Sequence, residues 1–338
     1  MFSMKKQRSS SPEPMLSIVI PVHNEAEVLP ALLARLWTTG QNLDGSFELL
    51  FVDDGSRDDS VAILMAARQR QPEIRVLQLS RNFGKEAAVS AGLEHARGEA
   101  VVLMDADLQD PPELIPDMLA QWRKGADVVL MKRRSRAGES WLKRITASLF
   151  YRLINRISDS PIPVDTGDFR LMSRRTVEAL KQLPERNRYL KGMFAWVGMP
   201  TVTLEFDRDP RTAGTTKWNY LKLVHLAMEG ITSFSTRPLR LALVLGLLAA
   251  GAGGAVGLWE VIRALVFGIS TPGYASLIAM VTFLSGVQLL CVGLLGEYIG
   301  RIYMETKQRP VFIVAEDSHE AMAYAQPLLR VAGHDQNQ

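Results

Sequence analysis

The sequence predicts an α/β chain in which a doubly wound, mostly parallel sheet is followed by a transmembrane hairpin of two helices. Two observations predict the sheet: short apolar runs alternate with helix-length segments, and these runs lack the polar alternation of half-exposed strands. A third observation predicts the hairpin, because only Glu260 and Arg263 carry charge between Leu241 and Gly296. The 338 residues average 47% hydrophobic and 22% charged, so the overall composition conceals the two parts.

The predicted strands and helices alternate along the first part of the chain. Strands are expected at residues 16–20, 47–52, 74–79, 100–104 and 127–131. Helices are expected between them at residues 27–38, 58–69, 85–96 and 112–124. Strands joined by helices run parallel, and ligands of such sheets bind beyond the carboxyl ends of the strands.

Polar clusters stand where the first four predicted strands end. They are His23 to Glu25, Asp53 to Ser56, Arg81 with Asn82, and Asp105 to Asp107. Because the carboxyl ends of parallel strands meet at one edge of the sheet, we expect these clusters to lie close together. The sequence has neither a G-x-G-x-x-G pattern nor a P-loop, which argues against a dinucleotide oxidoreductase and a P-loop NTPase.

Asp105 and Asp107 present closely spaced carboxylates, with the amide of Gln109 nearby. Oxygen ligands of this kind suit Mg²⁺ or Mn²⁺, which one or two carboxylates hold together with substrate phosphates. The alternative is an acidic surface loop. For the cluster that begins at Asp53, the alternative is a turn that caps the helix starting near Asp58.

The two predicted membrane spans lie at about residues 239–262 and 273–298, within the segment 238–300. Each is long enough for the ~30 Å hydrocarbon core, although the first could instead be a buried core helix. Residues 1–14 are expected to form a flexible N-terminal tail, and residues 301–338 a cytoplasmic C-terminal tail. The positive-inside rule places both ends of the hairpin in the cytoplasm. The basic residues that flank it are Arg237, Arg240, Arg301, Lys307 and Arg309.

Two more segments, residues 141–157 and the juxtamembrane residues 218–237, are predicted to form amphipathic helices at the membrane interface; the alternative is surface helices packed on the core. The net charge is +3, from 39 Lys and Arg against 36 Asp and Glu, and the basic residues occur in patches. A nucleic-acid partner is therefore not expected. Cys291 is the single cysteine, which excludes an intrachain disulfide and a Cys-based zinc site.

Five ordered motifs together resemble the family 2 glycosyltransferases, which have the Rossmann-like, mostly parallel GT-A fold. More narrowly, the chain is similar to the polyprenyl-phosphate glycosyltransferases, which include dolichol-phosphate mannose synthase and the bactoprenol glucosyltransferases. The resemblance covers about residues 16–310 and implies a catalytic domain at residues 15–217. The motifs are IVIPVHNE (18–25), VDDGS (52–56), DADLQDPPE (105–113), DTGDFRLMSR (165–174) and RTAGTTK (211–217).

The resemblance assigns roles to residues of this chain. Those that would bind the nucleotide are Pro21, His23, Glu25 and Asp54, although many relatives have Tyr at the position of His23. Those that would form the metal and diphosphate site are Asp105, Ala106, Asp107 and Gln109.

Four further residues would act on the phosphates and the sugar. Arg133 matches an arginine near the donor phosphates, and Arg211 and Lys217 match a pair on a mobile loop. Asp168 would lie near the anomeric carbon, in a turn over residues 165–170, where many relatives have Ser-Gly-Phe-Arg. The alternative for Asp168 is a turn carboxylate paired with Arg170.

The implied activity is an inverting transfer of a hexose, glucose from UDP-glucose in the first place, to polyprenyl (undecaprenyl) phosphate, with Mg²⁺ or Mn²⁺. An anionic lipid phosphate needs no strong base, so positioning and charge compensation are the main tasks. The implied location is the cytoplasmic face of the bacterial inner membrane, with a homo-oligomer and a flippase partner expected. Alternatives are GDP-mannose, UDP-GlcNAc or a UDP-aminoarabinose derivative as donor, or a non-catalytic membrane scaffold. A processive synthase is disfavoured, because the chain lacks its Gln-x-x-Arg-Trp element.

Overall fold

The structure is a computed structural model that describes residues 14–134, 166–186, 188–207, 237–267 and 273–319. The chain divides into two compact units. The first contains the sheet and its helices and includes the residues from Pro310 onward, and the second contains the two long helices of the hairpin.

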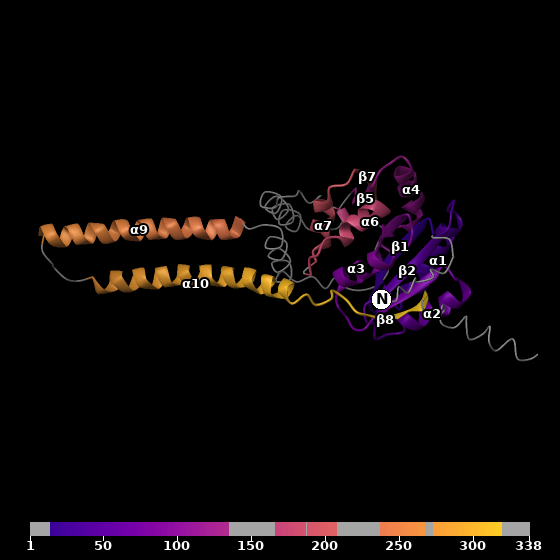
Figure 1. The fold of residues 1–338 in the computed structure, drawn as a ribbon, viewed down its shortest axis with the longest axis horizontal. Helices are drawn as coiled ribbons and strands as arrows, with labels where there is room; N and C mark the ends of the chain where they lie inside the picture. Colours follow the sequence, from indigo (N-terminus) through magenta and orange to yellow (C-terminus); the bar gives the residue numbers. More distant parts are fainter. Residues whose placement is uncertain (1–13, 135–165, 187, 208–236, 268–272, 320–338) are drawn as a thin grey trace, which may run out of the picture. The chain divides into compact units, whose positions relative to one another are not determined.

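The first unit is built on one eight-stranded sheet with the order β7-β5-β6-β4-β1-β2-β3-β8 (Figure 1). β1 pairs in parallel with β2 and β4, β2 with β3, and β5 with β7, so the predicted mostly parallel α/β fold is confirmed. The five predicted strands are all present, with ends shifted by up to two residues. The strands are β1 (Leu16–Val22), β2 (Phe47–Asp53), β3 (Ile74–Leu79), β4 (Ala100–Leu103), β5 (Val128–Arg133), β6 (Thr166–Ser173), β7 (Thr201–Phe206) and β8 (Val314–Asp317).

Two strands run antiparallel to their neighbours and were not predicted. β6 lies between β4 and β5, so the expected turn at residues 165–170 is wrong from Thr166 onward. Thr-Gly-Asp at its start is typical of a turn, but Phe169 and Leu171 are buried in the core and draw the segment into the sheet. β8 pairs with β3, so residues expected in a C-terminal tail instead complete the edge of the sheet.

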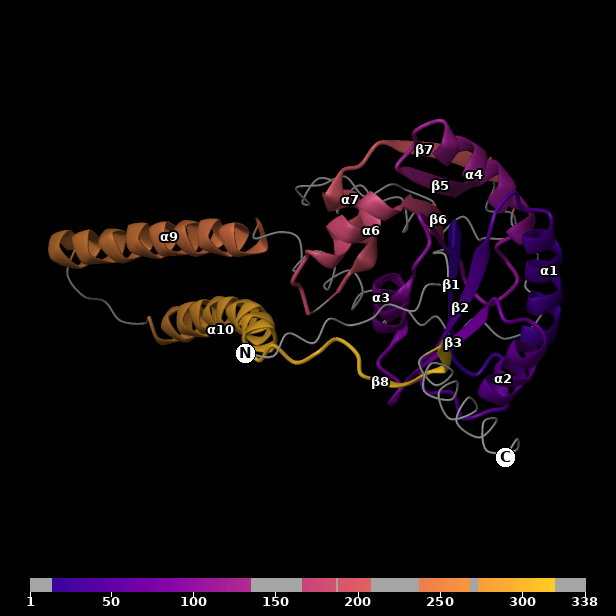
Figure 2. The ribbon, with the colours of Figure 1, turned by 45° about the vertical axis from the view of Figure 1, so that its right-hand side comes forward.

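Helices cover both faces of the sheet, with α1, α2 and α4 on one face and α3 and α6 on the other (Figure 2). A Cβ atom on Gly92 of α3 would collide with the side chain of Val19 in β1, so this helix lies unusually close to the sheet. The helices are α1 (Leu29–Gln41), α2 (Ser60–Arg70), α3 (Lys85–His95), η1 (Pro112–Leu114), α4 (Ile115–Arg123), α6 (Arg174–Lys181) and α7 (Leu190–Val197).

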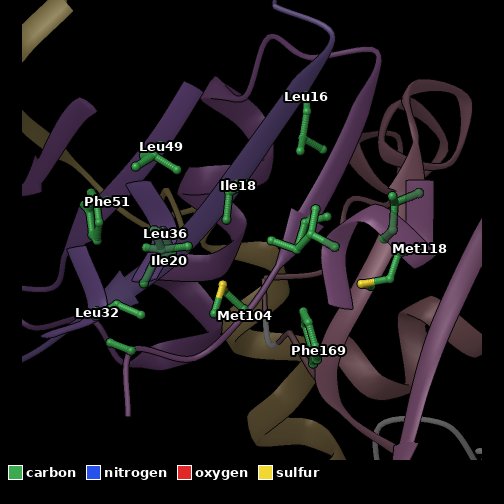
Figure 3. Packing of buried hydrophobic residues seen from close by; sticks show 14 of the residues in the cluster. Leu16, Ile18, Ile20, Leu32, Leu36, Leu49, Phe51, Met104, Met118 and Phe169 are labelled. Carbon is green, nitrogen blue, oxygen red and sulfur yellow. The ribbon is translucent and has the colours of Figure 1, made fainter. Parts of the chain in front are cut away.

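The main core lies between the sheet and the α1 and α4 face. Leu16, Ile18 and Ile20 alternate along β1 and pack with Leu36 of α1 and Phe169 of β6 (Figure 3). All five side chains are 1% exposed or less. Burying one such side chain contributes about 1.5–3 kcal/mol, so the core holds the strand ends in fixed positions.

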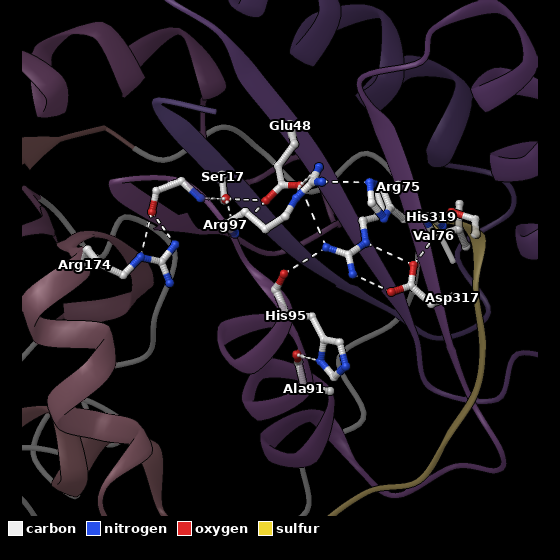
Figure 4. Close-up of polar contacts among 12 residues, drawn as sticks. Ser17, Glu48, Arg75, Val76, Ala91, His95, Arg97, Arg174, Asp317 and His319 are labelled. Atoms are coloured by element: carbon white, nitrogen blue, oxygen red, sulfur yellow. Dashed lines mark hydrogen bonds and ion pairs between the residues drawn. The ribbon is translucent and has the colours of Figure 1, made fainter. Parts of the chain in front are cut away.

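A network of buried charges fastens β8 to the rest of the sheet (Figure 4). Arg75 Nε donates to Asp317 Oδ1 at 3.0 Å, and a second guanidinium nitrogen contacts the other carboxylate oxygen. Arg97 Nη2 lies 2.8 Å from Glu48 Oε2, and Ser17 Oγ donates to Glu48 Oε1 at 2.5 Å. The strand therefore depends on side chains of β1, β2 and β3 and on the loop after α3.

The second unit consists of α9 (Arg237–Phe267) and α10 (Tyr274–Thr306). α9 is longer than the expected 239–262 at both ends, and α10 starts one residue after the expected 273 and ends eight residues after the expected 298. Within the described residues, one stretch is long and apolar enough to cross a membrane, Phe283–Thr306, and Gly246–Trp259 is a shorter apolar helix. Large side chains such as Leu265 and Leu290 are 82% and 76% exposed. Such exposure marks a surface that contacts lipid or protein, and it indicates membrane association. The predicted amphipathic segments at residues 141–157 and 218–236 lie outside the described residues.

Candidate active site

The polar clusters predicted at the strand ends come together at one edge of the sheet. The parallel registers place Val22 of β1 beside Asp53 of β2, and Val19 beside Leu103 of β4. Pro21 lies within β1 beside Val52, and the loops after β1, β2 and β4 therefore start side by side. The polar clusters therefore lie at the edge of the sheet where the sequence predicts them.

His23 connects the loop after β1 to the loops after β2 and β3. Its Nδ1 lies 3.0 Å from the carbonyl oxygen of Asp54, which can only accept, so Nδ1 carries the proton. Asn82 Nδ2 lies 3.1 Å from His23 Nε2 and donates to it. Glu25, two residues on, donates its backbone N–H to Ser60 Oγ at 3.0 Å, which ties this loop to the start of α2.

Asp54 holds the loop after β3 and is 3% exposed. Its two carboxylate oxygens accept from the backbone N–H groups of Phe83 and Gly84, at 2.7 and 2.9 Å. Gly55 has φ +67°, and a Cβ atom there would lie 2.6 Å from the backbone nitrogen of Asn82. Asp54 thus orders two loops of the site instead of capping α2, where the Asp58 carboxylate accepts from the N–H of Ser60 at 3.1 Å.

The loop that contains Asp105 and Asp107 is tightly organised. The backbone N–H of Gln109 donates to Asp107 Oδ1 at 3.1 Å, and Ala106 is 5% exposed. Leu108 has φ +60°, a left-handed conformation that is uncommon for a non-glycine residue and often found at functional sites. Among the described residues, no three or more His, Cys, Asp or Glu side chains gather to form a complete metal site. Two carboxylates with an amide nonetheless fit Mg²⁺ or Mn²⁺, because such ions complete their coordination with substrate phosphates.

Lys85, at the start of α3, bridges two of the predicted site residues. Its Nζ lies 2.6 Å from Asp105 Oδ1 and 2.5 Å from Asp168 Oδ2. The expected alternative, a pair between the Asp168 carboxylate and Arg170, is met only in part: the charge of Arg170 helps to lower the pKa of Asp168, but the direct ion pair of Asp168 is with Lys85. Arg170 instead donates to the carbonyl oxygens of Asp168 and Gly167, at 3.3 and 3.0 Å.

The sequence analysis missed Lys85, although the chain carries a signal for it. A helix N-terminus bears partial positive charge, so a lysine in the first helical position is unfavourable unless an anion lies nearby. Lys85 follows the polar Arg81 and Asn82 at the site edge of the sheet. A lysine in that position therefore predicts that carboxylates lie close to its ammonium group.

The charges around Asp168 shift its pKa strongly. Burial raises the pKa of Asp168, but the charges of Lys85 and Lys191 outweigh burial and lower it to about 2. Burial also lowers the pKa of Lys85, whereas the carboxylates of Asp105 and Asp168 raise it overall. Both groups are therefore ionised throughout the physiological range, and Asp168 can accept but not donate a proton.

Glu86 has the opposite shift. Burial and the negative charge of Asp168 raise the pKa of Glu86 to about 7, against the lowering effect of the Leu190 N–H, which donates to Glu86 Oε2 at 3.2 Å. Burial lowers the pKa of Arg170 to about 10, and its guanidinium carbon lies 3.9 Å from the centre of the Phe194 ring. Glu86 and Arg170 thus attach α7 to the strand and helix that carry Asp168 and Lys85.

Arg133 ends β5 next to the beginning of β6. A Cβ atom on Gly167 would lie 3.5 Å from a terminal guanidinium nitrogen of Arg133. The structure therefore brings Arg133 close to the segment of Asp168. Arg211 and Lys217 lie outside the described residues.

Comparisons with known proteins identify the family of the chain. The model of "Glycosyl transferase family 2" matches residues 17–181, and that of the "GtrB C-terminal hairpin" matches residues 237–302. The chain is 47% identical over 305 residues to a bactoprenol glucosyl transferase of Shigella phage SfV, covering 90% of this chain and 99% of the relative. It is 46% identical over 299 residues to a prophage bactoprenol glucosyl transferase homolog of Escherichia coli K12, covering 88% and 98%.

Among solved structures, S. aureus TarS 1-349 in complex with UDP matches with a TM-score of 0.45 and 18% identity, over 64% of each chain. The classification rests on these two relatives, which are nearly half identical to the chain over almost their full length. This chain belongs to the family 2 glycosyltransferases and carries the GtrB C-terminal hairpin after its catalytic domain.

Proposed function

We propose that this enzyme transfers glucose from UDP-glucose to polyprenyl (undecaprenyl) phosphate at the cytoplasmic face of the bacterial inner membrane. The observation that carries the proposal is the convergence of Asp105, Lys85 and Asp168 at the carboxyl edge of the sheet. This convergence occurs in a chain nearly half identical to proteins named bactoprenol glucosyl transferase.

The loops at the sheet edge supply the donor site in this proposal. His23 and Asp54 hold the loops after β1, β2 and β3 in a fixed arrangement, so a nucleotide would meet an ordered surface. Asp105 and Asp107 with Gln109 would hold Mg²⁺ or Mn²⁺. When bound, such an ion stabilises the negative charge of the departing nucleoside diphosphate.

Asp168 and the nearby cations would act on the acceptor side. With its pKa lowered to about 2, Asp168 stays ionised and can accept a hydrogen bond from a sugar hydroxyl. The lipid phosphate is already anionic, so its oxygen attacks C1 without a general base, and one displacement inverts the anomeric centre. Arg211 and Lys217 would offset the negative charge of two phosphate groups brought together, and Arg133 would lie near the donor phosphates.

The membrane part of the proposal has α9 and α10 cross the bilayer as a hairpin with both ends in the cytoplasm. The apolar stretch Phe283–Thr306 and the match to the GtrB hairpin support it. The segments at residues 141–157 and 218–237 would lie at the interface and bring the lipid phosphate to the site. A homo-oligomer and a flippase partner stay expectations from the family resemblance.

A transfer assay tests the proposal. Purified protein in detergent receives undecaprenyl phosphate, Mg²⁺ or Mn²⁺ and radiolabelled UDP-glucose, UDP-GlcNAc, UDP-galactose or GDP-mannose, and label in the lipid phase is counted. Asp107→Asn serves as the control because it removes one charge with little change in shape. Label that comes from UDP-glucose alone and is lost in the control supports the proposal. Label from another donor means that the enzyme transfers that donor's sugar instead of glucose. No transfer by folded protein refutes it and favours the scaffold alternative.

A further inference from the structure

Two acidic residues, Asp105 and Asp168, lie close together near the paired ends of β4 and β6. β4 and β6 are antiparallel, with Leu103 opposite Arg170. Asp105 follows β4 by two residues and Asp168 precedes Arg170 by two, and both carboxylates lie within 2.6 Å of the same nitrogen, Lys85 Nζ. Like charges directly opposite each other across two strands are destabilising. The two strands can therefore carry these carboxylates side by side only if a cation compensates them.

Lys85 is that cation, and it comes from a third element. Its Nζ contacts one oxygen of each carboxylate, at 2.6 Å from Asp105 and 2.5 Å from Asp168. Lys85 is the first residue of α3, which packs closely on β1 at Gly92. The Lys85 side chain is 47% exposed, against 25% and 21% for the Asp105 and Asp168 side chains, so Lys85 lies on the solvent side of the two carboxylates.

Lys85 pairs with the Asp105 carboxylate, which together with Asp107 would hold a divalent cation, so the ammonium group and the ion would share one carboxylate. An ammonium on a flexible four-carbon stem is a mobile point charge that can exchange one carboxylate for another. Displacement from Asp105 would leave Lys85 with Asp168, at 2.5 Å. The Lys85 ammonium group can therefore compensate carboxylate charge both before and after metal binding.

We propose that Lys85 is a positioning residue that serves as the resident counter-ion of Asp105 and Asp168 and competes with the divalent cation for Asp105. It keeps the two carboxylates together in the free enzyme and holds Asp168 once the metal has taken Asp105. The inference rests on the proposed function only in taking Asp105 and Asp107 as metal ligands. It requires that the free enzyme bind the ion weakly until the nucleotide sugar brings additional ligands.

The deciding variant is the double substitution Lys85→Gln with Asp168→Asn. It removes one positive and one negative charge, so the net charge of the cluster stays the same while Asp105 loses its competitor. Full-length protein in detergent is titrated with Mn²⁺ without nucleotide, and free Mn²⁺ is measured by electron paramagnetic resonance. The double variant is expected to bind Mn²⁺ about twofold to fivefold more tightly than the wild type, which is the range of a partly exposed ion pair.

Equal or weaker Mn²⁺ binding by the double variant overturns the inference. Structural damage lowers affinity, so a gain cannot arise from a merely structural role of Lys85. Lys85→Gln alone is expected to gain at least as much, and if the uncompensated carboxylates prevent its folding, the double variant still decides. Lys181→Gln is the matched control because Lys181 Nζ pairs with Glu178 at 2.9 Å on α6, and it is expected to match the wild type.

The transfer assay separates this inference from the proposed function. If the wild type transfers glucose while the double variant gains no Mn²⁺ affinity, the function stands and the role of Lys85 is refuted. If the variant gains affinity but the wild type transfers no sugar, the role of Lys85 stands and the function is refuted. Circular dichroism and thermal unfolding establish that each variant is folded.

Discussion

The ion pair between Arg75 and Asp317 is predicted to carry much of the stability of the catalytic unit. The two side chains are 10% and 6% exposed and make two contacts with each other. Removing one partner of a buried pair costs about 3–5 kcal/mol, since the other charge is left without compensation. Asp317→Asn keeps the shape, and Arg75 retains a hydrogen bond of 2.8 Å to the carbonyl of His95 and lies 4.0 Å from Glu48. We therefore expect the lower end, about 3 kcal/mol.

Thermal unfolding followed by circular dichroism checks this value. A loss of about 3 kcal/mol corresponds to a fall in Tm of about 6–12 °C for a domain of this size. Glu113→Gln is the matched control, because Arg35 and Glu113 form an equally bidentate pair, at 2.9 and 2.7 Å, whose side chains are 31% and 53% exposed. An exposed pair contributes about 1 kcal/mol or less. If Asp317→Asn lowers Tm no more than Glu113→Gln does, the reasoning from burial is refuted.

The same pair also predicts a pH dependence. Burial raises the pKa of Asp317, but the hydrogen bonds and charge of Arg75 lower it overall. A carboxylate with a lowered folded-state pKa contributes stability above its unfolded pKa of about 3.9, and this contribution is lost as the pH falls through the folded-state value. The difference in Tm between the wild type and Asp317→Asn should therefore be full at neutral pH and shrink below about pH 4.

Three other predictions concern the site. Because the pKa of Glu86 is raised to about 7, the wild type should lose stability relative to Glu86→Gln as the pH rises from about 4.3 to 7, and parallel Tm curves would contradict this. Asp168→Asn should lower kcat for glucosyl transfer by about 10²-fold or more with little change in the KM for the donor; an unchanged kcat would exclude a role in the transition state. Gly55→Ala, at φ +67°, should destabilise the protein by about 1–2 kcal/mol in urea unfolding, and a neutral effect would contradict the close approach to Asn82.

The strands at the centre of the sheet could be predicted from sequence because both of their faces are buried. β3 was placed with its observed bounds, and β1 with its first residue. β6 and β8 could not be predicted in the same way. β6 begins with turn-like residues, and β8 is a short strand, Val-Ala-Glu-Asp, whose partner Arg75 stands 242 residues earlier. A local pattern cannot report a stabilising contact so distant in the chain.

The site could be predicted where it follows directly from strand ends. His23, Asp54 and Asp105 are expected near one another because parallel strands bring their carboxyl ends to one edge, and the strands that precede them are parallel neighbours. Lys85 and its contact with Asp168 depend on the antiparallel register of β6 against β4 and on the packing of α3. These are tertiary features. In the sequence, Lys85 looks like an ordinary helix residue and Asp168 like an ordinary turn residue.

The position of β8 also affects the order in which the sheet is completed during synthesis. Until β8 is made, β3 is an edge strand with one row of unpaired N–H and C=O groups, which other chains can join. Asp317 follows Arg75 by 242 residues, a stretch that includes the whole hairpin, and at about 5–20 residues per second its synthesis takes roughly 12–50 s. The edge of the nascent catalytic unit therefore stays open to chaperones or to other chains until both helices of the hairpin have left the ribosome.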